Sequence, residues 1–292
     1  MSGGRCSELS RTAGESLAAT ATFAERWLLV EVPGSWPRDV SVPGVLPEQA
    51  QQAVSAWLTS TPCSRLLFIR RPGKTSGGPV AFAVHAGESE TEVRRIGLEA
   101  LEDLASVDFT TDGDVRDLHL ALVCGHGSRD ACCSLRGTAV FGALAGRLGD
   151  EELWISSHHG GHRFAANVLV LPAGLHFGRV DPDEAPLVVA RAFAGRIELG
   201  RYRGRTCYET AVQAAERAVR DALDLQGVAD LRVEGVEGAT VRFRSWDGTG
   251  CTAVVEEVAG PRVPASCGAD PEVQRAFRAR WLIGNCRRCG DG

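Results

Sequence analysis

The sequence has almost no lysine, no long apolar run and no secretion signal at its beginning. Lys74 is the only lysine among 32 basic residues, an imbalance that we attribute to coding bias and not to a binding face. No stretch reaches the roughly 18–20 apolar residues that a membrane helix needs. Residues 1–16, MSGGRCSELSRTAGES, lack the basic segment and the apolar segment of a signal peptide. These absences predict a cytoplasmic protein that does not act on membranes.

The remaining composition is that of an ordinary globular protein. Apolar residues make up 44% and charged residues 24% of the 292 positions, which is enough chain for two or three domains. The net charge of −5 argues against nucleic acid as a partner. In a reducing compartment, the ten cysteines indicate metal or redox chemistry more than a disulfide scaffold.

Apolar periodicity and turn residues divide the chain into three predicted regions. An N-terminal α/β domain is expected over residues 1–112, a second domain over 113–200, and a small α+β region with a cysteine-containing tail over 201–292. The first domain is expected to contain strands at 27–32, 65–70 and 79–85 and helices at 47–59 and 91–105. We expect the last two of these strands to form a hairpin.

The second domain shows the strand and helix order of a thioredoxin-like fold. We expect strands at 118–123 and 152–156 around a helix at 134–148, then a hairpin turning at 172–174 and a helix at 183–195. The first two domains share a β-α-β-β-α pattern that suggests a diverged duplication. In the third region we expect a helix at 208–225, strands at 230–235, 239–244 and 252–258, and one more helix in the tail.

Two glycine-rich segments carry most of the chemistry. CGHGSRDACC, residues 124–133, follows the first strand of the second domain, and SHHGGH, residues 157–162, follows the next strand. The two loops should meet at one end of the sheet and bring Cys124, Cys133, His158 and His162 together. Thiolate and imidazole are ligands for both zinc and iron.

Several interpretations of these residues are open. Two cysteines and two histidines fit tetrahedral zinc or a [2Fe–2S] cluster, and the long spacing between the cysteines suits a cluster better. A second interpretation is a nucleophilic Cys124 or Cys133 activated by His126 and Asp130, which leaves SHHGGH without a role. A third is that these residues only pack in the core.

The stretch CGHGSRDACCSLRG, followed by SHHGGHRFAANVLVLPAGLHFGRVDP, resembles the sucrase/ferredoxin-like family, which is related to the thioredoxin-like [2Fe-2S] ferredoxins. The similarity extends over roughly residues 5–205 and includes the segment RYRGR. It implies that Cys124, Cys133, His158 and His162 bind a [2Fe-2S] cluster, with the histidines in place of a second cysteine pair. No residue supports a sucrase activity.

The sequence leaves the ligands ambiguous at two positions. Cys132 precedes Cys133 and His159 follows His158, so each pair offers two candidate ligands, of which the spacing favours Cys133 and His158. His126, Arg129 and Asp130 are expected to surround the cluster, with Arg129 donating hydrogen bonds to its sulfur. Cys286 and Cys289, with Cys267, form a second candidate site.

The resemblance predicts an electron-transfer protein, more an electron carrier than an enzyme with its own substrate. Imidazole ligands would raise the reduction potential and couple it to protonation. Its partner would be a reductase or an electron-accepting protein. The alternatives from other classes are a zinc-stabilised or cluster-free interaction module and a thiol-dependent oxidoreductase. The oligomeric state is not predicted.

Overall fold

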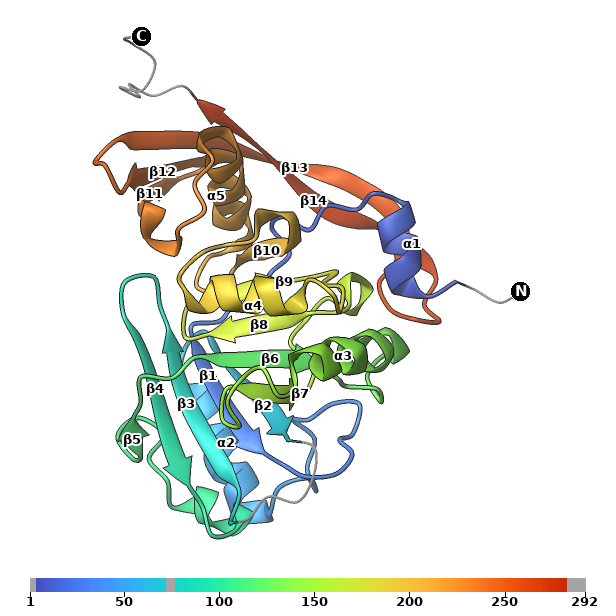
Figure 1. The fold of residues 1–292 in the computed structure, drawn as a ribbon, viewed down its shortest axis with the longest axis vertical. Coiled ribbons are helices and arrows are strands. Elements are labelled where there is room, and N and C mark those ends of the chain that lie inside the picture. The colour runs from blue at the N-terminus through green and yellow to red at the C-terminus, as the bar shows by residue number, and fades with distance from the viewer. Residues whose placement is uncertain (1–3, 72–76, 283–292) are drawn as a thin grey trace.

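A ten-stranded mixed sheet runs through most of the molecule, in the order β10-β9-β8-β6-β7-β2-β1-β3-β4-β5 (Figure 1). The computed structural model describes residues 4–71 and 77–282. The strands of this sheet are β1 (Arg26–Glu31), β2 (Ser64–Arg70), β3 (Val80–Ala86), β4 (Thr91–Gly97), β5 (Asp114–Val115), β6 (Leu120–Cys124), β7 (Leu153–Ser156), β8 (Val168–Leu171), β9 (Leu175–Phe177) and β10 (Tyr202–Arg205).

The sheet consists of two halves with the same strand arrangement. In the first half, β1 is parallel to β2 and antiparallel to β3, which pairs with β4. In the second half, β6 is parallel to β7 and antiparallel to β8, which pairs with β9. The halves join edge to edge, where β2 is antiparallel to β7. This repeat is what a diverged duplication would produce.

The sheet curls so strongly that one of its faces packs against itself. Phe82 on β3 and Trp154 on β7 are separated by two intervening strands, β1 and β2. Their ring centroids nevertheless lie only 5.6 Å apart, edge to face. The core on this inner face is built from side chains of both halves, including Trp27, Phe82, Leu122, Trp154 and Leu169.

Helices cover the outer face of the sheet. Helix α2 (Glu48–Ser60) packs on the first half, and α3 (Ala131–Leu144) and α4 (Ala185–Phe193) pack on the second. Ile155 contacts both helix-covered cores, so these helices lie on the same face. The 3-10 turns η1 (Leu101–Ala105), η2 (His162–Phe164), η3 (Leu199–Arg201) and η4 (Val228–Asp230) lie in the connections.

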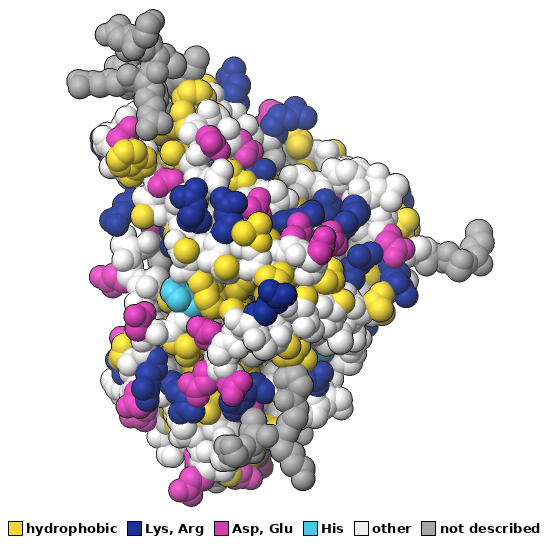
Figure 2. Space-filling view, in the orientation of Figure 1, with side chains coloured by type: hydrophobic (Ala, Val, Ile, Leu, Met, Phe, Trp, Pro, Cys, Tyr) yellow, Lys and Arg dark blue, Asp and Glu magenta, His cyan; other side chains and the backbone are white. Residues whose placement is uncertain are grey.

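A second, antiparallel sheet completes the molecule. It contains β11 (Leu231–Glu237), β12 (Thr240–Ser245), β13 (Gly250–Pro264) and β14 (Pro271–Leu282), and its core is closed by helix α5 (Thr210–Leu223). The β13–β14 hairpin is long and extends to the N-terminal helix α1 (Cys6–Thr12) (Figure 1). Arginine and acidic side chains are interspersed over the face shown in Figure 2.

The mixed α/β class is confirmed, but three element predictions are wrong. Residues 91–97 form strand β4 and not a helix, because Val93 and Ile96 face opposite sides of the sheet and each enters a different core. The tail forms β14 and not a helix, since it pairs along β13. Strands β2 and β3 do not form a hairpin, because β1 lies between them.

Two further predictions concern the cysteines of the tail and the absence of a membrane helix. Cys286 and Cys289 lie outside the described residues. Within the part of the chain that is described, no helix is both long and apolar enough to span a membrane.

Candidate metal centre

The two glycine-rich segments follow neighbouring parallel strands and meet at one edge of the sheet. Cys124 is the last residue of β6, and the loop 157–161 follows β7, which is parallel to β6. Cys133 lies in the first turn of α3, whose N-cap is Asp130. The ends of parallel strands point the same way, so a strand–loop–helix segment and its neighbour's loop converge here.

Three of the four expected ligands lie together. The His158 Nδ1 atom is 3.7 Å from the Cys124 Sγ atom and 3.7 Å from the Cys133 Sγ atom. One ligand atom from each of these residues lies within 4.8 Å of the other two. Both cysteines are buried and His158 is half-buried, so the sulfurs are shielded from solvent while the imidazole borders it.

His162 stands beside His158 at the start of η2. Their ring centroids are 4.8 Å apart and the rings are tilted by 33°. The Nδ1 atom of His162 is buried and has no hydrogen-bond partner among the residues that the structure describes. An unpaired buried ring nitrogen is costly, and this one belongs to a ring that lies beside the His158 imidazole.

The two thiols differ in acidity because one donates a hydrogen bond to the other. The pKa of Cys124 lies well below the usual thiol value, since Cys133 donates to its sulfur and the nearby His158 adds a favourable contact and charge. The pKa of Cys133 lies well above it, since its proton is held in that hydrogen bond and burial adds to the shift. A metal binds thiolate, and the direction of these shifts makes Cys124 the more readily ionised of the two thiols.

His126 and Asp130 hold the cysteine loop, residues 125–130 between β6 and α3, in place. The His126 ring accepts a hydrogen bond from the backbone N–H of His158 at 3.1 Å, and its Nε2 atom lies 2.8 Å from the carbonyl oxygen of Pro37. Burial lowers the pKa of His126. Asp130 accepts the backbone N–H of Cys132 at 2.8 Å and so caps α3. Both residues position the loop through these hydrogen bonds.

Arg129 lies at the open side of the site. Together with His126 and His158 it lines a cavity of about 550 Å³. This cavity is the approach from solvent to the His158 imidazole.

The neighbouring candidates Cys132 and His159 turn away. Cys132 faces Cys6 and Cys267, with sulfur–sulfur distances of 3.6 and 3.3 Å. His159 is fully buried with its Nδ1 atom 3.0 Å from the His176 Nε2 atom, and burial lowers its pKa to about 4. The structure therefore brings Cys133 and His158, and not their neighbours, to Cys124.

A buried arginine supports the histidine loop, residues 157–161 after β7. No role for this residue was predicted from the sequence. Arg203 Nη1 donates to the carbonyl oxygen of Gly160 at 2.9 Å and to Asn167 Oδ1 at 2.8 Å. Gly160 and Gly161 have φ angles of +106° and +72°, which favour glycine. Burial lowers the pKa of Arg203 to about 9, against the raising effect of Cys124 and Cys133. The RYRGR segment was the available signal.

Comparison with known proteins finds a family model and several relatives that are similar to this chain. The sucrase/ferredoxin-like family model matches residues 17–204. Relatives named "Altered inheritance of mitochondria protein 32" come from Eremothecium gossypii (36% identical over 146 residues, 45% of this chain and 46% of the relative), Saccharomyces kudriavzevii (34% over 105 residues, 32% and 34%) and Meyerozyma guilliermondii (32% over 110 residues, 34% and 38%). The match thus spans less than half of each of these relatives. No solved structure matches the chain.

These findings confirm the family resemblance and correct the expected function. The relatives are named for altered inheritance of mitochondria and not as ferredoxin electron carriers. The prediction of an electron-transfer protein, drawn from the likeness to ferredoxins, is therefore wrong. The relation to thioredoxin-like [2Fe-2S] ferredoxins is not shown by these comparisons. They do not bear on the expected redox partner or on the domain boundaries, which stay predictions.

Proposed function

The chain belongs to the sucrase/ferredoxin-like family, and we propose that it is a metal-centre protein whose ligands are Cys124, Cys133, His158 and His162. The shared name of its relatives refers to the inheritance of mitochondria and to no reaction. The chemistry of the site is therefore inferred from its side chains.

One observation carries the proposal. Two buried thiols and an imidazole place their ligand atoms within 4.8 Å of one another, and the adjacent His162 offers a buried Nδ1 atom that is unpaired within the described chain. Buried polar atoms normally have partners. Two sulfurs and one nitrogen that converge, with a second imidazole beside them, are what a common ligand would explain.

The donor set supports a [2Fe-2S] cluster as the bound group. Two thiolates on one iron and two imidazoles on the other is an established form of such clusters. When bound, the cluster would neutralise the thiolates and cross-link β6, α3 and the histidine loop. The chain's own contribution is to keep Cys124 ionisable, to supply the Arg203 cation beneath the loop and to bury both sulfurs.

A specific distance favours a single metal ion as the second candidate. Bond lengths of about 2.3 Å to sulfur and 2.1 Å to nitrogen give a sulfur–nitrogen edge of about 3.6 Å in a tetrahedral site. The observed separations of 3.7 Å between His158 Nδ1 and each sulfur match that edge. Ligands on two different irons would lie farther apart.

Metal and sulfide analysis of the full chain tests the proposal. We expect about two irons and two sulfides per chain, a brown colour and an electron paramagnetic resonance signal after reduction. One zinc in place of iron, lost when Cys124 is replaced, would identify the single-ion form. Protein purified without oxygen that carries neither metal at this site would contradict the proposal.

Paired variants test the choice of ligands. Cys133→Ser and His158→Ala should lose most of the iron bound at this centre, whereas Cys132→Ser and His159→Asn should retain that iron, because the latter side chains face other residues. Iron and zinc content, measured with circular dichroism to confirm folding, separates the two groups. Equal metal loss in both members of a pair would reject the assignment.

We also propose a thioredoxin-like fold for the second domain and a reducing compartment for the protein. The strand order β7-β6-β8-β9, with β6 and β7 parallel, supports a thioredoxin-like arrangement for residues 113–200. Seven of the described cysteines, among them Cys6, Cys124 and Cys133, form no disulfide in the structure, which supports a reducing compartment such as the cytoplasm.

A further inference from the structure

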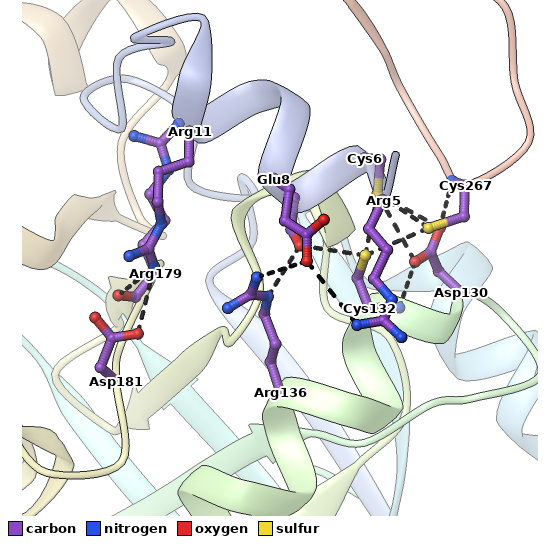
Figure 3. A network of polar contacts seen from close by, with 11 residues as sticks. Arg5, Cys6, Glu8, Arg11, Asp130, Cys132, Arg136, Arg179, Asp181 and Cys267 are labelled. Atoms are coloured by element: carbon purple, nitrogen blue, oxygen red, sulfur yellow. Dashed lines mark hydrogen bonds and ion pairs between the residues drawn. The ribbon is translucent and has the colours of Figure 1, made fainter. Parts of the chain in front are cut away.

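A second cluster of sulfur ligands lies behind the first site. Cys6 begins helix α1, Cys132 is in the first turn of α3, and Cys267 is in the loop between β13 and β14. The three sulfurs lie 3.6, 3.3 and 3.5 Å from one another. Figure 3 shows that they point to a common centre beside the carboxylate of Asp130. Three segments that are remote in sequence thus meet through their thiols.

Asp130 completes the cluster as a fourth ligand group. Both of its carboxylate oxygens lie 3.8 Å from the Cys6 sulfur. Each oxygen accepts one backbone N–H at 2.8 Å, from Cys132 and from Cys267. A carboxylate oxygen has two lone pairs, so each keeps one for a further contact. These hydrogen bonds fix the carboxylate toward the sulfurs.

Two successive hydrogen bonds, from Arg136 to Ser7 and from Ser7 to Cys132, support a thiolate at Cys132. The hydroxyl of Ser7 donates to the Cys132 sulfur at 3.2 Å. Arg136 Nε donates to the oxygen of Ser7 at 3.0 Å, which turns the hydroxyl proton toward that sulfur. Hydrogen bonds of this kind orient and stabilise the ligands of bound metals.

We propose that Cys6, Cys132, Cys267 and Asp130 form a second metal site, which takes one tetrahedral divalent ion of the zinc class. Zinc–sulfur bonds of about 2.3 Å give a tetrahedral sulfur–sulfur edge of about 3.8 Å. The observed edges of 3.3 to 3.6 Å are those of the same triangle, slightly contracted. Three cysteines and one carboxylate leave no open position, which is typical of a structural site.

This site is separate from the proposed first centre and does not depend on it. The two share no ligand, although Cys132 and Cys133 are adjacent in sequence. Cys6 and Cys267 lie outside residues 17–204, the part of the chain that matches the family model. The second site is therefore inferred from this chain's own residues, and it would fasten α1 and the β13–β14 hairpin to α3.

Packing alone does not account for the arrangement. Buried cysteines that act as small apolar residues contact carbon atoms from their neighbours. Here each sulfur has the other two as neighbours, and a charged carboxylate is oriented toward them by two backbone N–H groups. A disulfide would join two of the sulfurs and leave the third thiol and the carboxylate without a role.

Zinc analysis of the full chain, purified under reducing and anaerobic conditions, tests the site. We expect one zinc per chain in addition to the metal of the first centre. Cys267→Ser should lose this zinc and keep the metal of the first centre, whereas Cys124→Ser should show the reverse. Cys63→Ser, which removes an exposed cysteine outside both clusters, should match the wild type.

The wild-type protein decides the question even if a variant does not fold. Peptide mass spectrometry after alkylation should show Cys6, Cys132 and Cys267 as thiols that are protected in the zinc-loaded protein and labelled after a chelator is added. Wild-type protein with no zinc beyond that of the first centre would overturn the proposal. A disulfide between any two of these cysteines in the same preparation would overturn it as well.

Discussion

At the scale of single residues, side chains that are adjacent in the sequence contact different parts of the structure. Successive residues on a helix are rotated by about 100°, so Cys133 faces Cys124 while Cys132 faces Cys6 and Cys267. In the histidine loop, His158 faces the sulfurs and His159 faces His176. The tandem residues in the sequence are therefore not duplicate ligands, and each has its own contacts.

The buried His159 predicts a dependence of stability on pH. Burial lowers its pKa from 6.5 to about 4 in the folded chain, so between these pH values only the unfolded chain binds the proton. The free energy of unfolding should therefore fall as the pH drops from about 6.5 toward 4, by up to about 3 kcal/mol. Burial also lowers the pKa of His176, in the same direction.

Urea unfolding of the chelator-treated protein measures this effect, because metal release also depends on pH. His159→Asn should show a flatter slope than the wild type over the same pH range. Equal slopes for the two proteins would show that His159 is not the titrating group.

At the scale of elements, the approach of α3 to β6 sets the geometry of the proposed metal centre. Gly137 lies on the face of α3 that contacts the end of β6, and a Cβ atom there would overlap the carbonyl oxygen of Cys124. The backbone of β6 has no freedom to move aside, because both of its edges are paired. The distance between Cys133 and Cys124 therefore depends on this glycine.

Gly137→Ala should displace α3, lower the free energy of unfolding by about 1–3 kcal/mol and reduce metal occupancy. Gly142→Ala on the same helix is the matched control, since nothing lies within 4 Å of its added Cβ atom. That control should keep the metal and gain up to about 1 kcal/mol from helix propensity. Similar metal content in both variants would contradict the role of Gly137.

The sequence predicts helices and strands well where the apolar residues recur with a single spacing. It predicts them poorly where both faces of a strand are buried, because the apolar residues then no longer alternate with polar ones. A strand at 118–123 and a helix at 134–148 are expected from clear apolar patterns, and β6 and α3 form close to these positions, with shifted ends that bring Cys124 into β6 and Cys133 into α3. Val93 and Ile96 are three residues apart, as on one face of a helix, but they lie on opposite faces of β4. Both are apolar because both faces of this strand are buried. In β14, Phe277, Ala279 and Trp281 alternate with arginines and pack toward α5, a strand pattern that the helix prediction for the tail overlooked.

Contacts between distant segments were beyond prediction for a different reason. Cys6 and Cys267 meet only because the β13–β14 hairpin extends to α1. No local pattern encodes this meeting. Arg203 likewise reaches the histidine loop through the pairing of β10 with β9.

At the scale of the whole molecule, the two halves of the large sheet depend on each other. Leu120, Leu122, Trp154, Leu169 and Leu171 of the second half share their inner core with the first half. Loop contacts also cross between the halves, since Ser128 donates to the carbonyl oxygen of Trp36 at 2.6 Å and His126 contacts Pro37. Residues of both halves of the sheet thus support the candidate metal centre.

A fragment of residues 113–205 should therefore fold poorly, although it contains all four proposed ligands of the first centre. Removal of the first half would expose the inner apolar face, and an exposed apolar patch of this kind promotes aggregation. Circular dichroism, size-exclusion chromatography and metal content, compared with the full chain, measure the outcome. A monomeric fragment with full metal content would show that the second half is an independent domain.

The long β13–β14 hairpin also has a consequence for the order in which the protein matures during synthesis. The ligands proposed for the first centre have all been synthesised once His162 has been added, whereas the second set is complete only when Cys267 has been added as well. Cys6 is made well before Cys267 and must wait for it. A chain that stops before the β13–β14 hairpin would retain the first ligand set and leave α1 unfastened, so closure of the proposed second site requires translation through β13.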